Sequence, residues 1–128
     1  MIIHQHDYSS DYQPPIPMIE IVVSRRAGQD ELTLKAIVDS GADATMIPTP
    51  YLQQLKARKR HTAWLSGTAG GRYEASIYTV VIQIGSHQPM YVDVVGSERH
   101  DEVIVGRDVL NQLIVTLNGL AYTVEVST

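Results

Sequence analysis

The apolar residues of this chain fall into short stretches bounded by turn residues, and this spacing limits the possible folds more than any other feature. Ile19, Ile21 and Val23 alternate with the residues between them. Residues 32–38 follow a Gly-Gln-Asp turn, and residues 103–105 are wholly apolar and stopped by a glycine. Stretches of this kind predict β-strands. The same pattern predicts strands over residues 75–84, 90–95, 114–117 and 121–126.

Helical patterns are confined to two short segments. After Pro48, apolar residues recur at helical spacing, and the segment ends in a basic run over residues 56–60, where the C-terminus of a helix favours positive charge. Residues 108–113 have the length for one or two helical turns. Near the C-terminal end of the sequence, Asn118-Gly119 predicts a two-residue turn between the last two strands. The sequence thus predicts a mostly β domain with two short helices.

Length and composition suit one folded domain. The chain has 128 residues, of which 44% are hydrophobic and 19% are charged. Residues 1–15 are polar and end in two prolines, so we expect a flexible N-terminal tail followed by a domain over residues 16–128. The absence of cysteine excludes a disulfide framework, a thiolate metal site and a cysteine nucleophile.

Charge and hydropathy narrow the possible partners. The net charge of −4 argues against nucleic acid as a partner, because nucleic-acid binders normally carry excess positive charge. No apolar run reaches the roughly 20 residues that a membrane span needs, and the N-terminus lacks the pattern of a secretory signal, so we expect no membrane association and a cytoplasmic location. His4 and His6 have no third ligand nearby in the sequence, and no metal is expected.

The first feature that carries chemistry is the sequence Val38-Asp39-Ser40-Gly41. A predicted apolar strand ends in a carboxylate, a hydroxyl and a glycine. This order places an acid at the end of a strand, where the core holds it rigidly. The glycine lets another backbone approach closely. The alternative is an ordinary Asp-Ser-Gly turn between two strands, and these residues alone leave both interpretations open.

The second feature is Ile104-Val105-Gly106-Arg107-Asp108, which again joins an apolar strand to a glycine and a short helix. Together with the Asp39–Asp43 segment and a glycine-rich stretch over residues 66–71, it resembles the retropepsin family, the single-domain aspartic proteases of retroviruses with relatives in bacteria and eukaryotes. The family motif Asp-Thr/Ser-Gly-Ala-Asp and the hydrophobic-hydrophobic-Gly-Arg-Asn/Asp element are both matched, in the family's order. The resemblance covers roughly residues 18–126.

The resemblance implies an all-β, retropepsin-like acid protease barrel with a flap hairpin and two short helices. It makes Asp39 the catalytic residue, while Ser40 ties two catalytic loops together across a two-fold axis. Gly41 and Asp43 are expected to receive the main chain of the substrate. Arg107 is expected to pair with Asp43 and support the loop from below.

Further site residues follow from the same resemblance. Met46 and Ile104 are expected in side-chain subsites, and Gly70 and Gly71 at the tip of the flap. Ala42 stands where many pepsin-like enzymes have Ser or Thr, whose hydroxyl stabilises the ionised aspartate. Without that hydroxyl the carboxyl pair should release its shared proton at higher pH, so we expect optimal activity in weak acid, at about pH 5–6.

One Asp-Ser-Gly sequence per chain has a consequence for assembly. Carboxylate proteolysis needs one ionised and one protonated carboxyl, so Asp39 must meet Asp39 of a second copy, and a homodimer is expected. The substrate would be an extended polypeptide, and no cofactor is expected. A catalytically silent dimerisation or peptide-binding module of the same fold stays open as the alternative. Unlike the retroviral enzymes, the chain continues after the second helix into a further hairpin.

Overall fold

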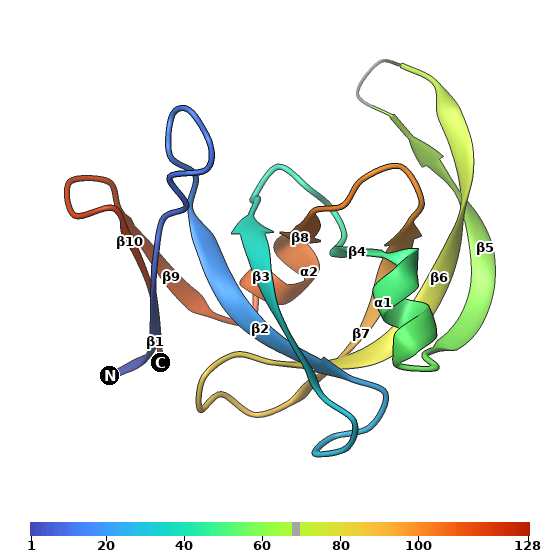
Figure 1. Ribbon diagram of the computed structural model, residues 1–128, viewed down its shortest axis with the longest axis horizontal. Helices are drawn as coiled ribbons and strands as arrows, with labels where there is room; N and C mark the ends of the chain where they lie inside the picture. The colour runs from blue at the N-terminus through green and yellow to red at the C-terminus, as the bar shows by residue number, and fades with distance from the viewer. Residues whose placement is uncertain (68–69) are drawn as a thin grey trace.

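The computed structural model describes residues 1–67 and 70–128 (Figure 1). Strands dominate, with two short helices between them. In chain order the elements are β1 (Ile2–Asp7), β2 (Met18–Ser24), β3 (Leu32–Val38), β4 (Met46–Pro48), α1 (Thr49–Gln54), β5 (Arg58–Ser66), β6 (Arg72–Gln83), β7 (Met90–Ser97), β8 (Val103–Val105), α2 (Arg107–Leu110), β9 (Ile114–Asn118) and β10 (Thr123–Ser127).

The main body is a seven-stranded sheet in the order β2-β3-β8-β4-β7-β6-β5. Strand β2 also pairs antiparallel with β6, with Val23 opposite Ile82, so the sheet closes on itself. Closure leaves fewer unpaired strand edges exposed to water. This barrel-like architecture with two short helices confirms the predicted fold class.

The two predicted motif strands are neighbours in this sheet. Strands β3 and β8 run parallel, with Ala36 opposite Val103 and Val38 opposite Val105. Because parallel strands end at the same edge, the segments that follow them leave the sheet side by side. Segments separated by more than sixty residues in sequence therefore meet at one place, which is where the candidate site lies.

The core explains the alternating pattern of the sequence. Side chains on successive strand residues point to opposite faces, and the core buries one face of strands such as β2. Ile19, Ile21 and Val23 of β2 are fully buried, as are Val80 and Ile82 of β6. These strands pack into one apolar cluster that also includes the middle of α1 and α2. The sheet is thereby fixed in register beneath the site.

A second, three-stranded sheet has the order β1-β10-β9. The expectation of a flexible tail is wrong for residues 2–7, which pair antiparallel with β10, with His4 opposite Val126. The Tyr8 N–H extends this pairing by donating to the Tyr122 carbonyl at 2.8 Å. Ile3 packs against the core, while Ile2 is exposed and residues 4–7 are polar, so the strand has one apolar anchor and the sequence gives a weak signal.

Two local predictions also need correction. The basic run does not end a helix, because α1 stops at Gln54 and Arg58 begins β5. Lys56 lies between them with a positive φ of 53°, the left-handed conformation that commonly terminates a helix. The last hairpin does not turn at two residues: Asn118 is opposite Thr123, so four residues form the loop. The Asn118 side chain stabilises that longer loop by accepting a hydrogen bond from the Ala121 N–H at 3.1 Å.

Within the described residues, none of the helices has the length and apolar character needed to cross a membrane.

Candidate active site

Asp39 lies at the point where β3 leaves the sheet. Its N–H donates to the Val105 carbonyl at 3.0 Å, which continues the pairing of β3 with β8 by one residue. The chain then turns, and the Ala42 N–H donates to the Asp39 carbonyl at 3.2 Å. The Gly41 N–H donates to the Asp39 carboxylate oxygen Oδ1 at 2.9 Å. The backbone of the loop therefore orients a partly exposed carboxylate.

Space is tight around the glycine of this loop. A Cβ at Gly41 would lie 3.1 Å from Asp39 Oδ1, closer than an ordinary van der Waals contact. A side chain here would push against the carboxylate that the backbone N–H holds. The Asp-Ser-Gly order thus combines an acid with a residue that leaves its carboxylate uncrowded.

The second motif supports the first from α2. The Arg107 N–H donates to the Ala42 carbonyl at 2.9 Å, and its guanidinium Nη1 donates to the Ser40 carbonyl at 2.7 Å. The other guanidinium nitrogen forms an ion pair with Asp43. Asp43 is 90% exposed, so water screens this ion pair, and its contribution is more to loop geometry than to stability.

A buried network beneath the loop was not predicted. Thr45 is fully buried; its N–H donates to both carboxylate oxygens of Asp108, at 3.1 and 3.0 Å. Its hydroxyl donates to Asp108 Oδ1 at 2.7 Å and accepts from the Gly106 N–H at 3.1 Å. The same Asp108 oxygen accepts from the Val109 N–H at 2.9 Å. Only Asp108 was singled out by its motif position, and no local pattern marks Thr45.

Gly106 is where the two loops touch most closely. A Cβ at this position would lie 2.7 Å from the Ala44 carbonyl carbon and 2.9 Å from the Ala42 carbonyl oxygen, both of them backbone atoms. Its φ of −95° is open to any residue, so space and not backbone conformation selects glycine. The glycine of the second motif thus lets the two motif loops pack together.

The predicted subsite residues lie beside these loops. Met46 and Ile104 are register partners in the antiparallel pairing of β4 with β8. Both are partly buried, and Met46 packs against the small cluster of Ala75, Ile77 and Val95. The structure therefore brings two apolar side chains next to the strand end that carries Asp39. Their contact with a substrate stays a prediction.

Gly67, Gly70 and Gly71 lie at the end of the β5–β6 hairpin, which belongs to the main sheet and extends away from it at one end of the molecule (Figure 1). The Gly67 N–H donates to the Gly71 carbonyl at 2.6 Å, and Gly70 has a positive φ of 86°. Thr68 and Ala69, also within the predicted flap tip, lie outside the described residues. Among the described residues, no hydrogen bond joins this hairpin to the Asp39 loop.

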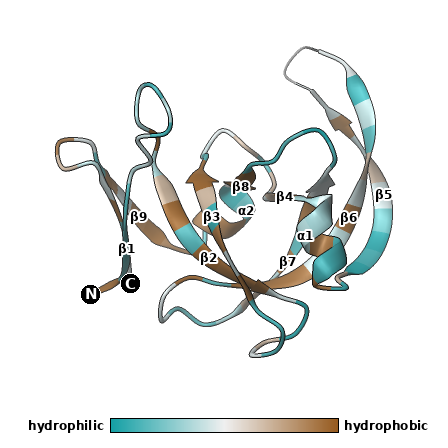
Figure 2. Ribbon diagram, viewed as in Figure 1, coloured by the Kyte–Doolittle hydropathy of each residue, from teal (hydrophilic) through white to brown (hydrophobic). Residues whose placement is uncertain are grey.

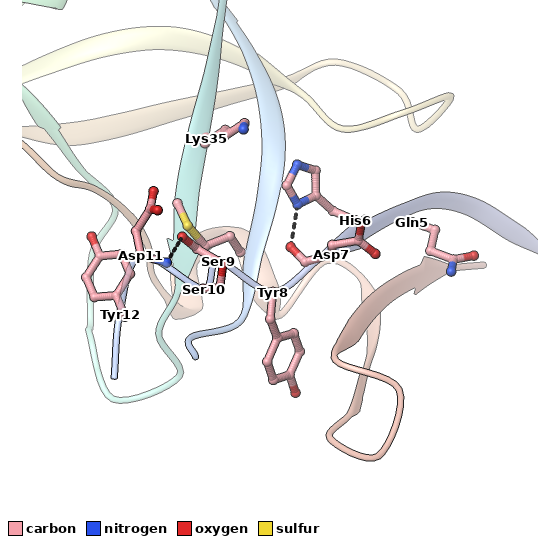
Figure 3. Close-up of a pocket in the computed structure, with 10 residues that line it drawn as sticks. Gln5, His6, Asp7, Tyr8, Ser9, Ser10, Asp11, Tyr12 and Lys35 are labelled. Carbon is pink, nitrogen blue, oxygen red and sulfur yellow. Dashed lines mark hydrogen bonds between the residues drawn. The ribbon is translucent and has the colours of Figure 1, made fainter. Parts of the chain in front are cut away.

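A hollow of about 690 Å³ lies elsewhere, along the end of β1 and the segment that follows it (Figure 3). Residues 5–12 line it together with Met18 and Lys35. Neither motif contributes to its walls, so it is distinct from the candidate site. In the described part of the chain, no three or more His, Cys, Asp or Glu residues are grouped so as to hold a metal ion.

Comparison with known proteins agrees with this geometry. Residues 28–112 match the family described as gag-polyprotein putative aspartyl protease, and this match spans both motifs. The chain belongs to this family of retropepsin-like aspartic proteases. No match was found among curated proteins.

Solved structures of the same fold come from viruses, bacteria and protozoa. EIAV protease in complex with an inhibitor superposes with a TM-score of 0.62 at 21% identity, covering 76% of this chain and 86% of that one. A retropepsin-like aspartic protease from Rickettsia conorii gives a TM-score of 0.65 at 14% identity, covering 95% of this chain and 87% of that one. The retroviral protease-like domain of Ddi1 from Leishmania major gives a TM-score of 0.52 at 17% identity, covering 87% of this chain and 93% of that one. At these identities the likeness establishes the fold.

Proposed function

We propose that this protein is an aspartic endopeptidase that works as a homodimer, with Asp39 of each chain forming one catalytic pair. The ionised carboxylate takes a proton from a water molecule, whose oxygen attacks the carbonyl carbon of the peptide bond. The protonated carboxyl donates to the carbonyl oxygen. When the tetrahedral intermediate collapses, the C–N bond breaks and a proton passes to the leaving amine.

The observation that carries this proposal is the setting of Asp39. It is an accessible carboxylate at the joined ends of two core strands, and a backbone N–H orients it at 2.9 Å. An ordinary surface turn needs none of the supporting contacts that come from α2. Because one chain supplies one such acid, the second carboxyl comes from a second copy.

The neighbouring residues take supporting roles in this proposal. Ser40 ties the two catalytic loops together across the two-fold axis, and Gly41 and Asp43 bind the main chain of an extended polypeptide. Arg107 keeps the loop in place through the Ser40 carbonyl and Asp43. An aspartate pair activates water by itself, so the reaction calls for no cofactor.

The substrate is an unfolded or extended segment, held as a β-strand. Met46 and Ile104 offer it an apolar surface beside the acid. The β5–β6 hairpin, with Gly70 and Gly71 near its end, closes over the bound segment as the flap. Two copies of each element surround the substrate in the dimer.

Cleavage of an unfolded protein tests the proposal. Asp39→Asn should abolish cleavage in weak acid, while the matched variant Asp30→Asn, in an exposed turn between β2 and β3, should cleave as the unchanged protein does. A statine-type inhibitor should block the activity. A catalytically silent peptide-binding module would show no cleavage in any variant and would bind peptide equally well after Asp39→Asn.

A further inference from the structure

Half of the basic residues of the chain lie in one short stretch of the sequence. Residues 56–72 contain five of the ten lysines and arginines and no acidic residue. Four of the five form a run that leads into β5: Lys56, Arg58, Lys59 and Arg60. The chain as a whole has a net charge of −4, so this stretch opposes the charge of the rest of the molecule. Such a separation of charge is typical of a surface that binds an anionic partner.

The basic run is exposed on both faces of β5. All residues from Arg58 to Thr62 are exposed, and an alternation with partly buried residues begins only at Ala63. Figure 2 shows this half of β5, beside α1, coloured as hydrophilic. Among the residues that the structure describes, the one ion pair joins Arg107 to Asp43. The positive charge of β5 is therefore not neutralised by an acid of its own chain.

Strand β5 is also an edge of the main sheet. It pairs with β6, and none of the described strands pairs with its other side. The register of the β5–β6 pairing shifts between Lys59 and His61, so the basic run includes an irregularity of the strand. The outer N–H and C=O groups of β5 are open to hydrogen bonds with an added strand.

The charge of this edge selects the strand that can pair with it. Charged side chains keep most strands away from an edge, and repulsion between like charges excludes a second copy of β5. An extended segment rich in Asp and Glu meets no such repulsion, because its carboxylates face basic side chains. Nucleic acid fits this surface less well, because a protein with a net charge of −4 repels a polyanion and a strand edge matches only another peptide backbone.

We propose that the outer edge of β5, over residues 58–62, binds an acidic, extended segment of the polypeptide substrate as an added strand. Main-chain hydrogen bonds hold the segment in an extended conformation, and ion pairs with Arg58, Lys59 and Arg60 select its acidic residues. This segment is separate from the residues that are cleaved. The inference rests on the proposed function, since the bound segment belongs to the chain that the catalytic pair cuts.

Binding of an acidic peptide tests the surface without cleavage. The probe is a short fluorescent peptide that alternates Glu with Thr, and its anisotropy is measured with Asp39→Asn chains. In that background, Arg58→Gln/Arg60→Gln should raise the dissociation constant about tenfold. The matched control Arg25→Gln/Arg26→Gln removes two exposed arginines that follow β2 and should change the constant by less than about twofold. Far-UV circular dichroism checks that each variant is folded.

Two further probes decide the kind of partner. The same peptide with alternate backbone nitrogens methylated keeps its charge but loses main-chain donors, so it should bind at least about fivefold more weakly. A single-stranded oligonucleotide of equal charge should also bind more weakly than the unmodified peptide. Equal binding of the methylated peptide, tighter binding of the oligonucleotide, or equal effects of the two double variants would each overturn the proposal.

Cleavage connects this surface to the proposed function. Two unfolded substrates share one cleavable segment, and the first carries a Glu-rich extension where the second carries Gln. With the unchanged chain, the acidic substrate should have a KM about tenfold lower and the same kcat, and Arg58→Gln/Arg60→Gln should remove the difference. Equal KM values would show that β5 does not recruit substrate. If neither substrate is cleaved while the acidic peptide still binds at β5, the proposed function is wrong and the binding surface stands.

Discussion

The Thr45 hydroxyl donates a hydrogen bond of 2.7 Å to Asp108 Oδ1, joining the two motif loops across 63 residues of sequence. Thr45 is fully buried, and Asp108 also accepts both Thr45 N–H contacts. This pair fastens α2 beneath the loop that carries Asp39. The candidate site is therefore a product of two distant segments held by one buried network.

Removing the Thr45 hydroxyl should destabilise the fold. Thr45→Val keeps the shape of the side chain but leaves Asp108 Oδ1 and the Gly106 N–H without their hydroxyl partner, at a cost of about 1–3 kcal/mol in the free energy of unfolding. Thr33→Val, on the exposed face of β3, should change it by less than about 0.5 kcal/mol. Urea unfolding measures the free energy of unfolding of both variants. Equal losses in Thr45→Val and Thr33→Val would show that the network does not stabilise the fold.

Gly106 gives a steric prediction. Gly106→Ala places a methyl group within 2.9 Å of backbone atoms of Ala42 and Ala44, so the motif loops must move apart. We expect a loss of about 1–3 kcal/mol in unfolding free energy and a large loss of cleavage. Gly119→Ala, where nothing lies within 4 Å, is the control for losing a glycine. Thermal unfolding in which both variants shift equally would contradict the packing argument.

Arg107 should affect activity more than stability. Arg107→Lys keeps the charge but loses the planar fork that reaches both the Ser40 carbonyl and Asp43. Because the ion pair is exposed, we expect a change in unfolding free energy of less than about 1 kcal/mol. Cleavage should fall by roughly tenfold or more, since a displaced loop misplaces Asp39. A variant with unchanged cleavage would remove Arg107 from the positioning role.

The position of Ala42 predicts the pH dependence of cleavage. We expect the unchanged chain to cleave best at about pH 5–6, because no hydroxyl at Ala42 stabilises the ionised carboxyl pair. Ala42→Ser should move the optimum towards lower pH. Initial cleavage rates across the acid range test this. An optimum of the unchanged chain at about pH 2–3, or no shift in the variant, would contradict the argument.

His4 predicts a loss of stability in acid. Burial of the ring, with the neighbouring His6 as the second cause, lowers the pKa of His4 below its ordinary value of 6.5, while Glu20 opposes the shift. The folded chain thus favours the neutral ring, whose Nε2 is buried with no hydrogen-bond partner among the described residues. This stability is fully present above pH 6.5 and declines as the pH falls below it.

Replacing the ring should reduce that pH dependence. For His4→Gln, the difference in unfolding free energy between about pH 8 and pH 5 should be smaller than in the unchanged chain. His61→Gln, at an exposed position of β5, serves as the control. Denaturant unfolding at the two pH values gives the comparison. The same pH dependence in all three proteins would show that His4 does not contribute.

Local pattern was enough to predict the core strands. The alternation from Ile19 to Val23 and the apolar stretch of Val103 to Val105 each coincide with an observed strand, since their burial follows directly from strand geometry. Strand β3 also begins at Leu32 and ends at Val38, as predicted, because a turn sequence and Asp39 bound it. The fold class follows from these strands.

Features that depend on distant contacts could not be predicted. The sequence of β1 is polar apart from its first residues, and it becomes a strand because β10 offers it an edge. Thr45 acquires its role only through contact with Asp108, which lies 63 residues away in the sequence. The turn after β9 is longer than Asn118-Gly119 predicts, because the pairing of Asn118 with Thr123 fixes its length.

The central claim is that two Asp39 residues, one from each chain, form a single catalytic pair. The most direct test mixes unchanged chains with Asp39→Asn chains at constant total concentration, allows subunits to exchange, and measures initial cleavage rates. If both aspartates are needed, the rate falls as the square of the fraction of unchanged chains. A rate that falls in simple proportion to that fraction would show that each chain cleaves with its own aspartate alone, and would contradict the account.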